Sequence, residues 1–205
     1  LQIDNRILTY MDNQWKAENE FSWSDLTGKT NVTAVYPVYP DLDYVQENLY
    51  KNNSLEDILY VKDEFPAGNS IHLQFKHLFS LLTLHLEGNL QTYFQKIEVT
   101  CPAVSSIIPK SAEIVLADNG THTTTIAQVS PSGNYSFIVP PVGNMVIAIN
   151  MVTNGKKYTT QLETKSFTGN KEYTYHLKIS EKTPGIMTAE DWIAFSQLIN
   201  SNTFT

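Results

Sequence analysis

The longest regular pattern of apolar and polar residues lies in residues 71–86, and it changes phase partway along. Up to His77 the odd positions, such as Phe75, are large and apolar, whereas their neighbours are polar. This alternation predicts a half-buried strand. From Leu78 onward the even positions carry the apolar residues, and a one-residue shift sends the apolar set to the opposite face. We therefore expect the chain to bend, bulge or change sheet within residues 77–80.

Short segments rich in aromatic and β-branched residues flank this stretch on both sides and predict further strands. The strands expected before it are residues 7–10, 14–17, 20–23, 33–37 and 57–61, with residues 41–56 as a long surface loop. Those expected after it are residues 92–100, 113–117, 122–129, 135–139, 145–152, 157–164 and 173–179. Asn-Gly and Gly-Asn pairs separate many of the later strands, including Asn119-Gly120, and this spacing is typical of antiparallel hairpins in a sandwich or barrel.

The last of these strands has two different faces. Tyr173, Tyr175 and Leu177 alternate with polar residues that include His176 and Lys178. This alternation predicts that one face of residues 173–179 packs on a core and that the other faces water.

The strands fall into two sets on either side of the phase change, and each set is large enough for one sandwich. We therefore expect an N-terminal β-sandwich domain at 1–79 and a C-terminal β-sandwich domain at 80–183. Residues 184–205 read as a linker and a short helix, with the start of a further truncated module left open. Thr188 is a suitable N-cap for that helix, which is the only helix that the pattern predicts.

Composition and charge exclude several classes of function. Charged residues make up 17% of the chain, below the roughly 25% usual for soluble domains. The net charge of -7 argues against nucleic acid and against an anionic membrane surface, because both require clustered Lys and Arg. No apolar run is long enough for a spanning helix, and Leu1 does not begin a signal peptide. The single cysteine, Cys101, excludes a disulfide framework and is expected to be a buried structural thiol.

No catalytic constellation emerges from the motifs. Gly28-Lys29-Thr30 resembles the end of a phosphate-binding loop, but Trp23 stands where the motif needs its first glycine. His77 and His85 are roughly 26 Å apart along an extended strand, so they do not share a metal ion, and His72 faces away from both. We therefore predict no catalytic, cofactor-binding or metal-ligating residue, and the sequence leaves the binding residues unknown.

The acidic pairs and the glycosylation sequons carry little chemistry. Acidic pairs in loops are most often solvated surface, and none has calcium-loop spacing. The acidic pairs are Asp41/Asp43, Glu56/Asp57 and Asp63/Glu64, and the sequons are at Asn31, Asn52, Asn119 and Asn134. The sequons matter only in a eukaryotic secretory chain.

Several segments, taken in their order, resemble a known family. They are Gln14-Trp15 with Phe21-Ser-Trp23, Ala34-Val-Tyr-Pro37, Asp57-Ile-Leu-Tyr60, Leu73-Gln-Phe-Lys-His77 and Gly169-Asn-Lys-Glu-Tyr-Thr-Tyr175. Together these segments resemble the fimbrillin-like (Mfa-like, type V pilin-related) surface lipoproteins of anaerobic Gram-negative bacteria. The resemblance implies an all-β fold with two tandem transthyretin-like β-sandwich domains. It also implies a lipoprotein precursor exported to the cell surface, in which proteolytic trimming at an arginine, as in some members, would fall at Arg6.

The resemblance implies a non-catalytic protein of the outer-membrane surface or the fimbrium, acting in adhesion or fimbria assembly. Its partners would be other pilin-like subunits joined by strand exchange, or a surface protein or glycan. Attachment to the outer membrane would run through a lipid anchor outside this chain. The helix-like C-terminal segment favours an adhesin or a module joined to further domains over a polymerising stalk subunit. The alternative is a surface carbohydrate-binding module attached to a larger protein, because the chain is rich in tyrosine.

Overall fold

The computed structural model describes most of the chain and is all-β apart from one short helix. The residues it describes are 8–12, 14–17, 28–39, 43–66, 72–88, 94–130, 132–153 and 156–179. The expected strand at 20–23, the expected C-terminal helix and Arg6 lie outside these residues. The predicted all-β class is confirmed, whereas the division into two tandem sandwich domains stays a prediction.

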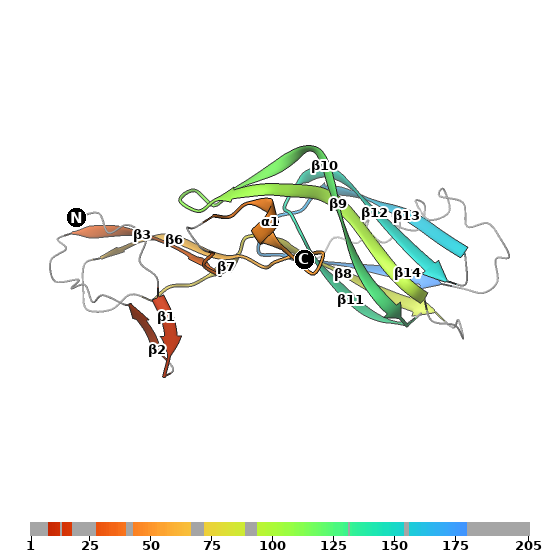
Figure 1. Cartoon of the computed structure of the whole chain (residues 1–205), viewed down its shortest axis with the longest axis horizontal. Helices are drawn as coiled ribbons and strands as arrows, with labels where there is room; N and C mark the ends of the chain where they lie inside the picture. Colours follow the sequence, from red (N-terminus) through yellow and green to blue (C-terminus); the bar gives the residue numbers. More distant parts are fainter. Residues whose placement is uncertain are drawn as a thin grey trace.

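The first part of the chain forms three small sheets. Antiparallel β1 (Leu8–Met11) and β2 (Gln14–Ala17) make the first. In the second, β6 (Leu59–Pro66) lies between β3 (Lys29–Tyr36) and β7 (Lys76–His77). The third is the hairpin of β4 (Tyr50–Lys51) and β5 (Ser54–Leu55), which follows α1 (Gln46–Leu49). In Figure 1 the sheets β1–β2 and β3–β6–β7 lie toward the left end of the elongated molecule, and α1 lies near its middle.

The later strands form two sheets that face each other across one core. The four-stranded sheet has the order β10-β9-β12-β13, and the three-stranded sheet has the order β11-β8-β14. Their bounds are β8 (Ser80–Gly88), β9 (Phe94–Ile108), β10 (Glu113–Val129), β11 (Gly133–Val139), β12 (Gly143–Thr153), β13 (Lys156–Ser166) and β14 (Glu172–Ile179). Alternate residues of each sheet, such as Leu84, Ile97 and Ile149, are fully buried between them.

The phase change marks the place where the chain leaves one sheet and enters another. β7 pairs with β6, whereas β8 pairs with β11 and β14, and the two residues between β7 and β8 form a bend. The predicted change of sheet is therefore confirmed. The predicted strand before it is mostly wrong, because residues 72–75 are not extended into a ladder and Phe75 is 36% exposed.

Residues 41–56 are not the surface loop that their polar composition predicts. Their described part, from residue 43, contains α1, β4 and β5, and it buries Tyr44, Leu49 and Leu55 at 2%, 0% and 4% exposure. These three side chains pack on the outer end of β9, where Val104 and Ile107 are also buried. The spacing of the apolar residues within the polar segment was the available signal, since such residues are commonly buried.

Asn119-Gly120 is not a hairpin turn but a bulge inside β10. The register of β10 on β9 shifts between Leu116 and Thr121, and the strand then continues to Val129. Asn119 has a φ of 54°, a left-handed conformation that Asn tolerates well. The hairpin of β9 and β10 instead turns after Ile108, and in Figure 1 its end arches over α1.

Candidate functional site

The bend between β7 and β8 is held by the turn that joins β13 to β14. The backbone N–H of Asn170 donates to the carbonyl oxygen of Phe79 at 2.9 Å, and the N–H of His77 donates to Asn170 Oδ1 at 3.0 Å. A Cβ atom on Gly169 would lie 2.5 Å from the carbonyl oxygen of Leu78, so this position requires glycine. The Gly169-Asn170 pair of the family-like segment therefore fixes the junction between the sheets.

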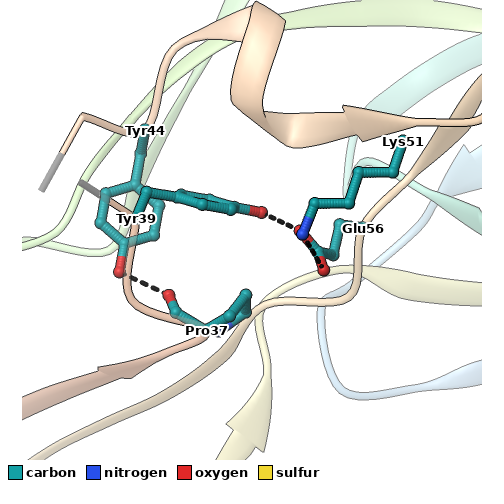
Figure 2. Close-up of polar contacts among 5 residues, drawn as sticks. All are labelled: Pro37, Tyr39, Tyr44, Lys51 and Glu56. Atoms are coloured by element: carbon teal, nitrogen blue, oxygen red, sulfur yellow. Dashed lines mark hydrogen bonds and ion pairs between the residues drawn. The ribbon is translucent and has the colours of Figure 1, made fainter.

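A charged and aromatic network lies beside the junction (Figure 2). The hydroxyl of Tyr39 and the ammonium of Lys51 both donate to the Glu56 carboxylate, and Lys51 Nζ is 2.8 Å from Glu56 Oε1. The ring of Tyr39 meets Tyr44 edge-on with centroids 4.9 Å apart, and the Tyr44 hydroxyl donates to the carbonyl of Pro37 at 2.7 Å. The network anchors the segment that carries α1.

Burial shapes the acid–base behaviour of this network. Burial, together with the hydrogen bond to the Glu56 carboxylate and its charge, raises the pKa of Tyr39 strongly. Burial by itself would raise the pKa of the Glu56 carboxyl. The hydrogen bonds from Lys51 and Tyr39 and the charge of Lys51 outweigh burial, so this pKa is lowered. The network therefore holds a neutral phenol against an ionised carboxylate. Each oxygen of the carboxylate accepts a hydrogen bond from a side chain of the same network, which gives Glu56 a structural role.

An open hollow of about 670 Å³ lies between α1 and the β9–β10 hairpin. It is lined by Val45, Gln46, Glu47, Tyr50, Ser105 and His122. The ring of His122 lies 3.9 Å from that of Tyr50, and its Nε2 is 2.9 Å from the carbonyl oxygen of Asn53. The Ser105 hydroxyl donates to the carbonyl oxygen of Val115 at 3.1 Å, so both Ser105 and His122 have backbone partners in this lining.

The structure also places the candidates that the sequence singled out. His72 is exposed, and His77 Nδ1 lies 2.6 Å from Asp57 Oδ2 at the junction, in keeping with a structural role. Cys101 is 6% exposed, and burial raises the pKa of its thiol to about 12, which confirms a buried structural thiol. Lys29 lies in β3 and forms a 2.9 Å ion pair with Glu64.

Sequence reasoning missed one constellation. His85, Glu87 and His176 each present one potential ligand atom, and these atoms lie within 4.8 Å of one another. His85 belongs to β8 and His176 to β14, and the parallel register of these strands places the two histidines side by side. The His-x-Glu spacing at 85–87 and the polar face of β14 were both visible in the sequence. The pairing of the two strands was not.

No helix in the part of the chain that the structure describes is long and apolar enough to cross a membrane.

Comparison with solved structures relates the fold to two Bacteroides proteins, each described as a "putative cell adhesion protein". The structure from Bacteroides ovatus ATCC 8483 superposes with a TM-score of 0.58 at 15% identity, covering 82% of this chain and 71% of that one. The structure from Bacteroides uniformis ATCC 8492 has a TM-score of 0.56 at 12% identity, covering 83% of this chain and 73% of that one. At these identities the likeness concerns the fold alone.

Comparison with curated proteins gives no match. The sequence profile of the fimbrillin-like family, in contrast, matches residues 2–192. This match spans nearly the whole chain, including the junction at residues 77–80 and the Gly169-Asn170 turn that holds it. The chain therefore belongs to the fimbrillin-like family, as the order of its sequence segments predicts.

Proposed function

We propose that this chain is a non-catalytic protein of the bacterial cell surface that acts in adhesion or fimbria assembly. The observation that carries the proposal is the fimbrillin-like match across residues 2–192. A surface location follows from the same membership, with the outer-membrane surface or the fimbrium as the expected site. Two of the described candidates have structural roles: each oxygen of the Glu56 carboxylate accepts a hydrogen bond, and Cys101 is buried with a raised thiol pKa.

Backbone pairing at a sheet edge is the mode of assembly that we propose. An edge strand presents unpaired N–H and C=O groups to which a strand of another chain adds. In the four-stranded sheet both outer strands carry features that discourage such pairing: a bulge interrupts β10, and β13 carries the exposed Lys157 near its start. β11 and β14 pair with β8 without a register shift. The edges of the three-stranded sheet are therefore the proposed sites of strand addition.

Sedimentation velocity and amide hydrogen exchange test this mode directly. We expect oligomers that grow with protein concentration, together with slower exchange of amides in β11 or β14 as the oligomers form. The central strand β12 is the internal control, because its neighbours β9 and β13 already flank it on both sides. A chain that stays monomeric at every concentration would contradict strand addition. Oligomers whose edge strands exchange as fast as in the monomer would contradict it equally.

The burial of several tyrosines weakens the argument for the carbohydrate-binding alternative. It draws on the richness in tyrosine, since exposed aromatic faces stack on sugars. Tyr39, Tyr44 and Tyr175 are buried in the two cores. Among the tyrosines whose side chains the structure describes, only Tyr36 and Tyr158 are exposed, at 50% and 37%. Tyr50, Tyr135 and Tyr173 also pack against these cores, so six of the eleven tyrosines are used in packing and the assembly proposal takes precedence.

A further inference from the structure

Two histidines and one carboxylate meet on the outer face of the three-stranded sheet. Leu84 and Leu86 point into the core and are 0% and 1% exposed, so the alternation of β8 turns His85 and Glu87 outward. In the parallel register of β8 and β14, His85 lies directly opposite His176. The ring centroids of the two histidines are 4.8 Å apart.

The spacing of the donor atoms fits a transition-metal ion. His176 Nδ1 is 3.3 Å from Glu87 Oε1, and His85 Nε2 is 3.5 Å from the same oxygen. For bonds of 2.0–2.1 Å the edge of a coordination tetrahedron is about 3.3 Å long. Both distances are close to that edge, and all three donor atoms lie within 4.8 Å of one another. Small side-chain rotations then suffice to close the site, because all three side chains are partly exposed, at 35%, 42% and 46%.

A fourth residue orients His85 for this role. Asn134 in β11 lies opposite His85 in the antiparallel register, and its Oδ1 is hydrogen-bonded to His85 Nδ1. An amide oxygen only accepts hydrogen bonds, so Nδ1 carries the proton and Nε2 directs its lone pair toward Glu87 and His176. Metal-binding histidines commonly have their second ring nitrogen held in this way.

We propose that His85, Glu87 and His176 form a binding site for a divalent first-row transition-metal ion of the zinc type. Imidazole nitrogens suit zinc, copper or nickel better than calcium or magnesium, which prefer oxygen ligands. Glu87 supplies the negative charge, and the fourth position is left to water or to a ligand from another molecule. A bound ion cross-links β14 to β8, the central strand of its sheet.

Lys178 is the charged neighbour that opposes binding. It lies opposite Glu87 in the register of β14 on β8 and shares the outward parity of His176. An ammonium group at this position competes with a metal ion for the Glu87 carboxylate. The Lys178→Gln variant is therefore expected to bind the ion more tightly than the wild type.

Calorimetric titration of the untagged, metal-free chain 1–205 with Zn²⁺ tests the site. We expect one ion per chain, and Co²⁺ in place of Zn²⁺ should give the intense visible absorption of tetrahedral coordination. The ligand variants His176→Asn and Glu87→Gln should weaken binding by about 100-fold or more. Asn134→Ala should weaken it by about 10- to 100-fold, the usual effect of losing an orienting partner. His72→Asn, at an exposed histidine outside the cluster, is the matched control and should leave binding unchanged.

Two results would overturn the proposal. One is a wild-type chain that takes up less than one equivalent of Zn²⁺ and shows no tetrahedral Co²⁺ spectrum. The other is an equal loss of affinity in His72→Asn and in the ligand variants, which would indicate unspecific binding. Far-UV circular dichroism of each metal-free variant verifies folding. If His176→Asn misfolds, His85→Asn replaces it as the variant that lacks one imidazole ligand.

Discussion

Protonation of the Glu56 carboxyl links the stability of the fold to pH. Its carboxylate accepts hydrogen bonds from Tyr39 and Lys51, and these donors lower its pKa although burial acts in the opposite direction. The folded protein therefore binds a proton at Glu56 more weakly than the unfolded chain does. Such a group stabilises the fold above its ordinary pKa, and this stabilisation is lost as the pH falls through the lowered value.

The variant Glu56→Gln should reveal this dependence. At neutral pH we expect it to lower the free energy of unfolding by about 1–2 kcal/mol, because it replaces charge-assisted hydrogen bonds with neutral ones. The difference from the wild type should shrink as the pH falls through the lowered pKa of Glu56, below the ordinary range of a Glu carboxyl, because the wild-type carboxyl then becomes protonated. Urea denaturation at a series of pH values measures this difference in the free energy of unfolding.

Glu64→Gln serves as the control for this experiment. Glu64 pairs with Lys29 on the surface, with side chains 45% and 75% exposed. The loss of this ion pair should lower the free energy of unfolding by less than about 1 kcal/mol at neutral pH, as is usual for exposed ion pairs. A constant difference between Glu56→Gln and the wild type across the pH range would contradict the role given to the Glu56 carboxylate.

At the scale of elements, the β13–β14 turn and the β7–β8 bend act as one unit. Their contacts involve backbone groups on both sides, including the N–H of Leu81, which donates to the carbonyl of Lys171 at 3.0 Å. The hydroxyl of Ser80 also donates to the carbonyl of Thr168 at 2.9 Å. The turn approaches the bend so closely at Gly169 that a side chain does not fit.

Gly169→Ala should therefore destabilise the protein by about 1–3 kcal/mol, the usual cost of forcing an extra methyl group into a packed site. The added Cβ would meet backbone atoms of Leu78, which do not move aside as a flexible side chain does. Gly143→Ala is the matched control, because a Cβ atom there meets nothing within 4 Å. It should be neutral or slightly stabilising. Equal unfolding midpoints in guanidinium for the two variants would show that the turn is not tightly seated.

At the scale of the whole molecule, a second core joins the early segments to the later strands. Phe79, at the bend, is 1% exposed and belongs to the same buried cluster as Leu49 and Ile58 from the first part of the chain. Val104 and Ile107 of β9 also belong to this cluster, and the N–H of Ile107 donates to the carbonyl of Tyr44 at 2.9 Å. This shared core includes residues on both sides of the boundary predicted after residue 79, and we expect it to couple the unfolding of the two parts.

Differential scanning calorimetry of Phe79→Ala tests the coupling. Truncating a buried Phe costs about 3–5 kcal/mol, which should lower Tm by roughly 10 °C for a chain of this size. The variant should still unfold in one transition, because both parts lose the same contact. Phe75→Ala, four residues earlier and 36% exposed, should change Tm little. Two separate transitions, only one of them shifted, would show that the two parts unfold independently.

The sequence by itself determined the fold class and the position of the junction. Alternating apolar residues such as Leu82, Leu84 and Leu86 report which face of a strand is buried, because side chains in a strand alternate between two faces. The phase shift near His77 reports a change of sheet for the same reason. The alternation in residues 173–179 likewise predicts which face of β14 points outward. These features are local, so the residues concerned and their neighbours suffice to predict them.

Only the tertiary structure decided which of these local elements meet. The polar segment 41–56 is folded because β9 offers an apolar surface for Tyr44, Leu49 and Leu55, and Asn119-Gly120 is a bulge because β10 continues along β9. His85, Glu87 and His176 form one cluster only because β14 pairs in parallel with β8. Pairing between strands far apart in the chain depends on the packing of the whole molecule, and no local pattern encodes its register.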